Sequence, residues 1–194
     1  MEIYPTNDEK RSWCFVPSRV KTTPKSVSVA MEEGLSLFQC EFVALYQQDN
    51  DWLLSFSRVP DVYDWGFHVT HYFQQQGVAD VLYLEPCDTQ VILLVIENYQ
   101  LISEMCIDRD DLADYLSFLG PQISRVALVQ SGLSEILQQL RRYIPALNDK
   151  EMVLSPPLTR FLTPDTQWRF QPADELLPRQ RWRQAFALGG GKAL

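Results

Sequence analysis

The residues that could hold a metal ion are few. His68 and His71 stand three positions apart, close to the spacing of two metal ligands on one helix, and Asp61 and Asp64 are the nearest acids. A complete site would need a third or fourth ligand. The surrounding segment is rich in aromatic residues, so the histidines also fit a packing role at the edge of a core contact. We favour the packing or exposed role and expect no metal.

The cysteines offer no site of their own. There are four, and they are far apart, with no CxxC pair: Cys14, Cys40, Cys87 and Cys106. A zinc site would have to collect ligands from remote segments. Nothing local orients a Cys–His pair for nucleophilic attack. We therefore expect free thiols in a reducing compartment.

The turns that could hold a nucleotide phosphate lack the residues for it. A phosphate site needs glycine-rich turns with free backbone N–H groups and an acid to organise a metal. The turn at 85–89 has no glycine, and Pro86 lacks an N–H group. The segment 130–134 could bind an anion at a helix start, but helix capping explains Ser134 equally well. No phosphate-loop, GxSxG or HExxH motif is present, so we expect no catalytic residue and no cofactor.

Charge is distributed unevenly along the chain. The net charge is −8, yet residues 179–194 contain four basic residues and no acid, which leaves −12 for residues 1–178. An acidic body repels nucleic acid phosphates, so we expect no nucleic acid partner. The acids at 108–114 are expected to cap a helix and form a solvated face, with a docking patch for a basic partner as the alternative.

Composition places the chain among globular proteins. It has 194 residues, 46% hydrophobic and 12% aromatic, enough for one core or for two small lobes. The first residues are polar and acidic, unlike a signal peptide, and no apolar run reaches about 18 residues. The chain as given is expected to be cytoplasmic.

The first part of the chain predicts few elements with clear periodicity. We expect a short strand at 13–17, a basic link at 18–26 and a short helix at 27–34. A strand hairpin is expected at 38–46 and 52–59, followed by an amphipathic helix at 62–77. Gly77 is placed to end the last helix.

The middle of the chain predicts a regular α/β unit. Strands are expected at 78–86, 89–97, 100–107, 125–130 and 151–154, and helices at 109–119 and 133–144. The run 89–97 is apolar throughout, as in a strand buried on both faces. Asn98 and Tyr99 form a tight turn.

The order β-β-β-α-β-α-β predicts a mixed sheet flanked by helices. It resembles a ribonuclease-H-like or degenerate actin-like lobe over 78–154. Residues 1–77 are then a degenerate first lobe or an added hairpin-helix layer, and 155–194 are an extended, proline-rich strap with a basic tail.

The tail predicts contact with a membrane surface. Arg179, Arg181, Trp182 and Arg183 place arginines around an indole, a combination that suits anionic headgroups and the bilayer interface. A merely solvated terminus remains open. Each charge near the surface contributes about 1 kcal/mol, so the tail alone is a weak anchor.

Together these features resemble the cytoplasmic domains of bitopic inner-membrane proteins of type IV pilus and type II secretion machines. The segments that carry the resemblance are 91–107, 125–140 and 176–186. The closest groups are the accessory proteins of type IVb pili and the secretion L proteins. The resemblance implies a non-enzymatic scaffold on the cytoplasmic side of the bacterial inner membrane. Its partners would be an assembly ATPase, an inner-membrane platform protein or companion pilus proteins.

Two rival hypotheses remain open. The chain could be a nucleotide-binding regulator of actin-like fold, which MgATP would stabilise against heat. It could instead be a soluble secretion adaptor or chaperone, with the arginine tail as a partner motif.

Overall fold

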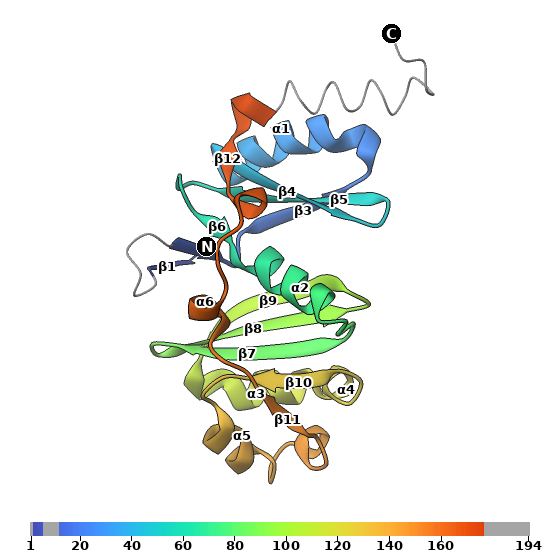
Figure 1. The fold of residues 1–194 in the computed structure, drawn as a ribbon, viewed down its shortest axis with the longest axis vertical. Helices are drawn as coiled ribbons and strands as arrows, with labels where there is room; N and C mark the ends of the chain where they lie inside the picture. Colours follow the sequence, from blue (N-terminus) through green and yellow to red (C-terminus); the bar gives the residue numbers. More distant parts are fainter. Residues whose placement is uncertain (1, 6–11, 177–194) are drawn as a thin grey trace. The chain divides into compact units, whose positions relative to one another are not determined.

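The computed structural model describes residues 2–5 and 12–176 and divides into two compact units (Figure 1). The first unit is Met1–Trp65 with Pro164–Leu194, and the second is the continuous segment Gly66–Thr163. This division differs from the predicted boundaries after residues 77 and 154. The helix predicted before residue 78 belongs mostly to the second unit, because its Phe73 packs on Tyr83 with ring centroids 6.0 Å apart.

The second unit is built on a five-stranded mixed sheet of order β11-β10-β7-β8-β9. Its strands are β7 (Val81–Cys87), β8 (Gln90–Glu97), β9 (Gln100–Asp108), β10 (Ala127–Gln130) and β11 (Met152–Leu154). The first three form an antiparallel meander, while β10 runs parallel to β7 and β11 parallel to β10. The predicted fold class is confirmed: a mixed sheet of ribonuclease-H-like strand order, flanked by helices.

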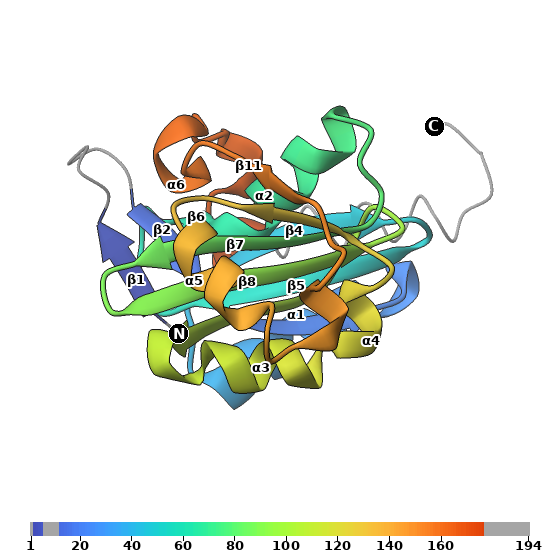
Figure 2. The same ribbon diagram turned by 90° about the horizontal axis from the view of Figure 1, so that it is seen from below.

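Helices cover both faces of this sheet (Figure 1). The helical elements are α2 (Trp65–Gln75), η2 (Arg109–Asp111), α3 (Leu112–Phe118), α4 (Gly120–Ile123), α5 (Ser134–Leu140), η3 (Pro145–Leu147) and α6 (Leu158–Phe161), where η denotes a 3-10 helix. Figure 2 views the sheet from the side of α3, α4 and α5. On that side Leu82, Leu84 and Leu93 pack against Leu116 and Leu137. The α2 and α6 helices lie on the opposite face.

The central strand β8 is buried on both faces, as predicted. All six residues from 91 to 96 are 0–1% exposed. The turn that follows is also as predicted: Asn98 and Tyr99 have φ angles of 50° and 65°. Two left-handed residues in a row are typical of a two-residue hairpin turn, whose twist matches that of the strands.

Two local predictions in this unit are wrong. The strand predicted to end at Pro86 continues to Cys87, because pairing with β10 stops at Leu84 and the missing N–H of the proline costs no ladder bond there. Of the predicted N-caps, Asp108 makes no side-chain cap, and Ser134 is the first residue of α5, whose N-cap position is Leu133. The helix after β9 therefore begins as the short 3-10 turn η2 before α3.

The first unit contains a four-stranded antiparallel sheet of order β12-β4-β5-β3. Its strands are β3 (Ser18–Thr22), β4 (Phe42–Gln48), β5 (Asp51–Ser57) and β12 (Gln171–Pro172). A smaller sheet joins β1 (Glu2–Pro5), β2 (Ser12–Phe15) and β6 (Tyr63–Asp64). The predicted hairpin is confirmed as β4 and β5. The link predicted at 18–26 is wrong, since it contains β3.

The helix α1 (Val27–Phe38) covers a face of the larger sheet and directly follows the 3-10 turn η1 (Pro24–Ser26). A second 3-10 turn of this unit, η4 (Thr166–Trp168), comes late in the chain. The α1 helix is four residues longer than predicted. It ends because Gln39 takes a left-handed conformation with φ 52°, and Cys40 N then donates to Leu35 O at 3.0 Å. The strand predicted from residue 38 therefore begins at Phe42.

Candidate functional site

The turn at 85–89, the first candidate for binding a phosphate, joins the end of β7 to the start of β8 and lies next to the end of β9. A surface hollow lies there, lined by Asp88, Thr89, Asp108, Arg109, Asp110 and Asp111, which we call the acidic hollow. Arg109 N donates to Thr89 O at 3.1 Å and joins the two loops that form it. Four carboxylates against one guanidinium make an electrostatic environment that opposes a polyphosphate.

The second anion candidate, the turn at 130–134, uses its backbone donors internally. Ser131 N donates to Leu84 O and Leu133 N donates to Gln130 Oε1, both at 2.9 Å. Gln130 Nε2 also donates to Ser134 Oγ at 2.6 Å, so this side chain organises the turn. Gly132 has φ 68°, which explains the glycine by backbone conformation alone. Two of the N–H groups that an anion would need are therefore occupied.

Among the described residues, the two histidines of α2 are not joined by further metal-ligating side chains. His68 is 5% exposed and His71 half-buried. Both acids named with them in the sequence bind arginines of the first unit: Asp64 pairs with Arg19, and Asp61 pairs with Arg169. Within residues 2–5 and 12–176, no three His, Cys, Asp or Glu side chains come together as metal ligands. The cysteines are free thiols, of which Cys14 is buried.

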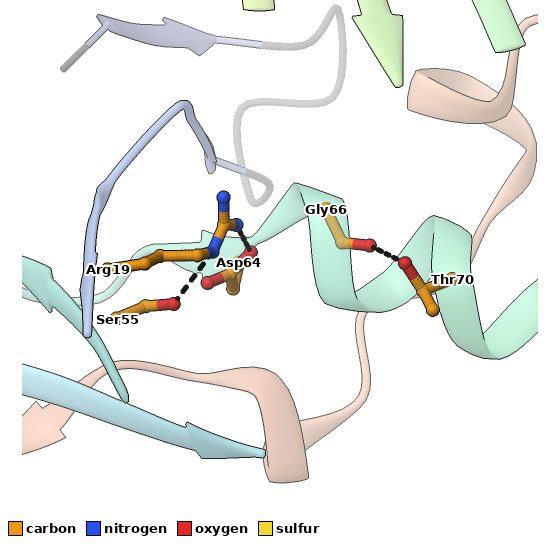
Figure 3. Close-up of polar contacts among 5 residues, drawn as sticks. All are labelled: Arg19, Ser55, Asp64, Gly66 and Thr70. Atoms are coloured by element: carbon orange, nitrogen blue, oxygen red, sulfur yellow. Dashed lines mark hydrogen bonds and ion pairs between the residues drawn. The ribbon is translucent and has the colours of Figure 1, made fainter. Parts of the chain in front are cut away.

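The ion pair of Arg19 and Asp64 is almost fully buried. Asp64 Oδ1 accepts a hydrogen bond from Arg19 Nη2 at 2.6 Å, and Arg19 Nε donates to Ser55 Oγ at 3.1 Å (Figure 3). The Asp64 side chain is fully buried and that of Arg19 is 14% exposed. The contact ties β3 and β5 of one sheet to β6 of the other. Removing one partner of such a pair typically costs about 3–5 kcal/mol, so its role is structural.

A buried carboxyl group lies on β7. Glu85 is 2% exposed, and its Oε1 accepts hydrogen bonds from Tyr83 Oη at 2.6 Å and from Thr159 N at 3.2 Å. Tyr83 Oη in turn accepts one from Leu158 N at 3.1 Å. We call these four residues the Glu85 network. It fixes the segment that leaves the second unit onto the face of the sheet.

Burial raises the pKa of Glu85 above its usual range, while the hydrogen bonds from Thr159 and Tyr83 oppose that rise. Burial also raises the pKa of Tyr83, and the neighbouring carboxyl group of Glu85 adds to the effect. Sequence reasoning missed this network because Glu85 and Thr159 are 74 residues apart. The only signal was an acid inside an apolar strand.

The outer strands of the sheet expose apolar side chains. On β11, Val153 is 46% and Leu154 is 71% exposed, and Phe161 of α6 is 59% exposed. On β9, at the other side, Ile102 is 52% exposed. Each of these strands has only one neighbour in the five-stranded order, so the described part of the sheet has two open edges.

The predicted membrane-contacting residues, Arg179, Arg181, Trp182 and Arg183, lie outside the described residues. In the part of the chain that the structure describes, no helix has both the length and the apolar character needed to cross a bilayer.

Comparison with known proteins gives a weak structural similarity and no family. No family model matches the sequence, and no curated protein matches it. A crystal structure from Bacteroides thetaiotaomicron, described as a protein with actin-like ATPase fold and unknown function, is similar to this chain with a TM-score of 0.46 and 11% identity. The similarity covers 82% of this chain and 69% of that one. It gives no information about activity or ligand.

Proposed function

We propose that this chain is a non-enzymatic docking domain of a membrane-anchored assembly protein. The sequence resemblance supports a place in a type IV pilus, with type IVb systems closest, or in a type II secretion machine. The domain binds the assembly ATPase or the inner-membrane platform protein. The basic tail around Trp182 then contacts anionic lipid at the cytoplasmic side of the inner membrane.

The observation that carries this proposal is the open edge at β11. An edge strand presents backbone N–H and C=O groups that an extended partner segment can pair with, and exposed side chains on it supply apolar contacts. Proteins usually protect such edges with charges or prolines. β11 is only three residues long and is followed by Pro156 and Pro157, but it exposes Val153 and Leu154, which favours recognition of a short extended segment.

The turns of the second unit support a role without nucleotide chemistry. The acidic hollow opposes a phosphate electrostatically, and the turn at 130–134 uses two of its N–H groups internally. A lobe of this topology with neither anion site suits recognition of a protein.

The test measures binding of the purified full-length protein to its companion assembly ATPase and platform protein. Substituting both edge residues, Val153→Lys and Leu154→Lys, should weaken the complex at least tenfold, because charges on an edge oppose strand pairing. The matched control substitutes Phe118→Lys and Tyr143→Lys, which are 80% and 77% exposed and are not part of β11. Equal binding by the edge variant and the control would contradict the role of this edge, and no binding to either companion by the unaltered protein would contradict the proposed function.

A further inference from the structure

A second hollow lies in the first unit, at the carboxyl end of α1. It has a volume of about 470 Å³, and its lining includes Leu37, Phe38, Cys40, Phe56, Arg58 and Val59. We call it the Arg58 hollow. It combines a mostly apolar lining with one cationic side chain, whereas the acidic hollow of the second unit is lined by four carboxylates and one arginine.

The floor of the Arg58 hollow is held rigidly by packing. Phe56 is fully buried, and Phe38 packs on it with ring centroids 5.4 Å apart. The α1 helix approaches β5 so closely that a Cβ atom on Gly34 would stand 2.2 Å from Phe56 Cζ. The glycine thus permits the close approach that sets the position of both rings.

The guanidinium group is fixed in place while keeping donors for a ligand. Arg58 Nε and Nη2 donate to Phe38 O at 3.3 and 3.1 Å, at the negative end of the α1 helix dipole. A guanidinium has five N–H groups; two donate to Phe38 O and the Cys40 thiol is a further partner, so two stay available. Among the residues that the structure describes, no carboxylate lies within salt-bridge distance of Arg58.

Apolar side chains form the rim. Leu37 is 74% exposed and Val59 is 37% exposed, although both are large and hydrophobic. An occupant that covers them removes apolar surface from water, and a carboxylate on the same occupant can accept hydrogen bonds from Arg58. Charge complementarity at this one point therefore selects an acid beside a large apolar residue.

We propose that the Arg58 hollow is a docking site for a partner peptide segment in which a large apolar side chain stands next to a carboxylate. This inference rests on the proposed docking function and adds a second contact, of different chemistry, to the open edge at β11. The acidic body of the chain repels an acidic partner at long range. Short-range apolar contact with Leu37 and Val59 then supplies most of the affinity, and Arg58 supplies the selectivity.

Cys40 offers a direct reporter of occupancy. Its thiol lies in the lining and donates to Phe38 O at 3.4 Å. Burial raises the pKa of Cys40, and the positive charge of Arg58 opposes that rise. A bound peptide covers the thiol and slows its alkylation, whereas Cys87 of the second unit serves as an internal reference.

The probe is the peptide acetyl-Gly-Ser-Leu-Phe-Asp-Glu-Gly-Ser-amide, compared with the same peptide carrying Asn and Gln in place of Asp and Glu. Binding to the full chain is measured by fluorescence anisotropy, and alkylation of Cys40 by iodoacetamide is followed by mass spectrometry. We expect the acidic peptide to slow Cys40 alkylation several-fold and to bind about tenfold more tightly than the amide peptide, the size of one charge-assisted hydrogen bond. Alkylation of Cys87 should not change.

Two variants locate the effect. Arg58→Gln should remove the preference for the acidic peptide, and Leu37→Ser, at a position that is 74% exposed, should weaken binding of both peptides. The matched control is Arg125→Gln, because Arg125 is also exposed and donates through Nε to a helix carbonyl, Pro121 O at 3.3 Å. Unchanged Cys40 alkylation, or an Arg58→Gln variant that still prefers the acid, would overturn the inference.

The two proposals fail separately. A companion protein that needs Val153 and Leu154, together with a peptide that ignores Arg58, leaves the docking function standing and removes this site. A peptide that binds at Arg58 while the full-length protein binds neither companion leaves the site and removes the proposed function.

Discussion

At the scale of single residues, this chain uses its buried polar groups to hold segments together. Asp64 and Arg19 join strands of two sheets, and the Glu85 network fastens a late segment to β7. None of these contacts could be predicted from the sequence, because the partners are 45 to 75 residues apart and no local pattern pairs them.

Glu85 should make the stability of the protein depend on pH. Its raised folded-state pKa means that its contribution to stability is complete below the unfolded-state pKa of about 4.3 and is lost as the pH rises through the folded-state value. The titratable group in contact with Glu85 is the phenol of Tyr83, whose raised pKa keeps it neutral across this pH range. Glu85→Gln cannot ionise and keeps an oxygen acceptor for Thr159. Its free energy of unfolding, relative to the unaltered protein, should therefore increase as the pH is raised from 4 to 8.

Urea unfolding across that pH range measures the effect, with the exposed Glu151→Gln as the control. A pH-independent difference between Glu85→Gln and the unaltered protein would contradict the prediction. Glu85→Ala leaves Tyr83 Oη and Thr159 N without their buried acceptor, and we expect it to cost about 1–3 kcal/mol at any pH.

At the scale of elements, prediction succeeded where each element has its own hydrophobic pattern. The continuous run of β8 and the tight turn at Asn98 specify the meander locally, so five strands in the second unit agree with the sequence within a few residues. Prediction failed for β3, an edge strand in which the basic residues Arg19 and Lys21 flank Val20 and leave no apolar alternation. It failed also at the end of α1, where a left-handed Gln39 stops the helix without a glycine to mark it.

Gly34 allows α1 to pack closely on β5, and its contribution to stability can be measured. In Gly34→Ala the new methyl group meets the Phe56 ring, and overpacking of this kind typically costs about 1–3 kcal/mol, more than alanine returns through helix propensity. Thermal and urea unfolding should show the loss. Gly120→Ala is the matched control, because its nearest contact would be Ala146 Cβ at 4.0 Å. Adding Phe56→Leu should restore part of the loss, and an unaltered stability in Gly34→Ala would show that α1 shifts freely on the sheet.

At the scale of the whole molecule, the docking proposal and the nucleotide alternative make opposite predictions about heat stability. A ligand at 100 times its dissociation constant stabilises the folded state by about 2.7 kcal/mol, which shifts Tm by several degrees in a chain of this size. We expect no change in Tm with millimolar MgATP relative to MgCl2 alone. A saturable rise that is lost when Ser131 or Gly132 is substituted would instead place a nucleotide at that turn.

The first unit is made of two stretches of chain separated by the whole second unit. During synthesis on the ribosome, the segment up to Thr163 emerges and can close its own sheet while the first unit still lacks β12. Until residues 171 and 172 emerge, the pairing groups of β4 that face β12 have no partner. The second unit is therefore positioned to complete its folding first, and the first unit reaches its final strand order only after residues 171 and 172 have emerged.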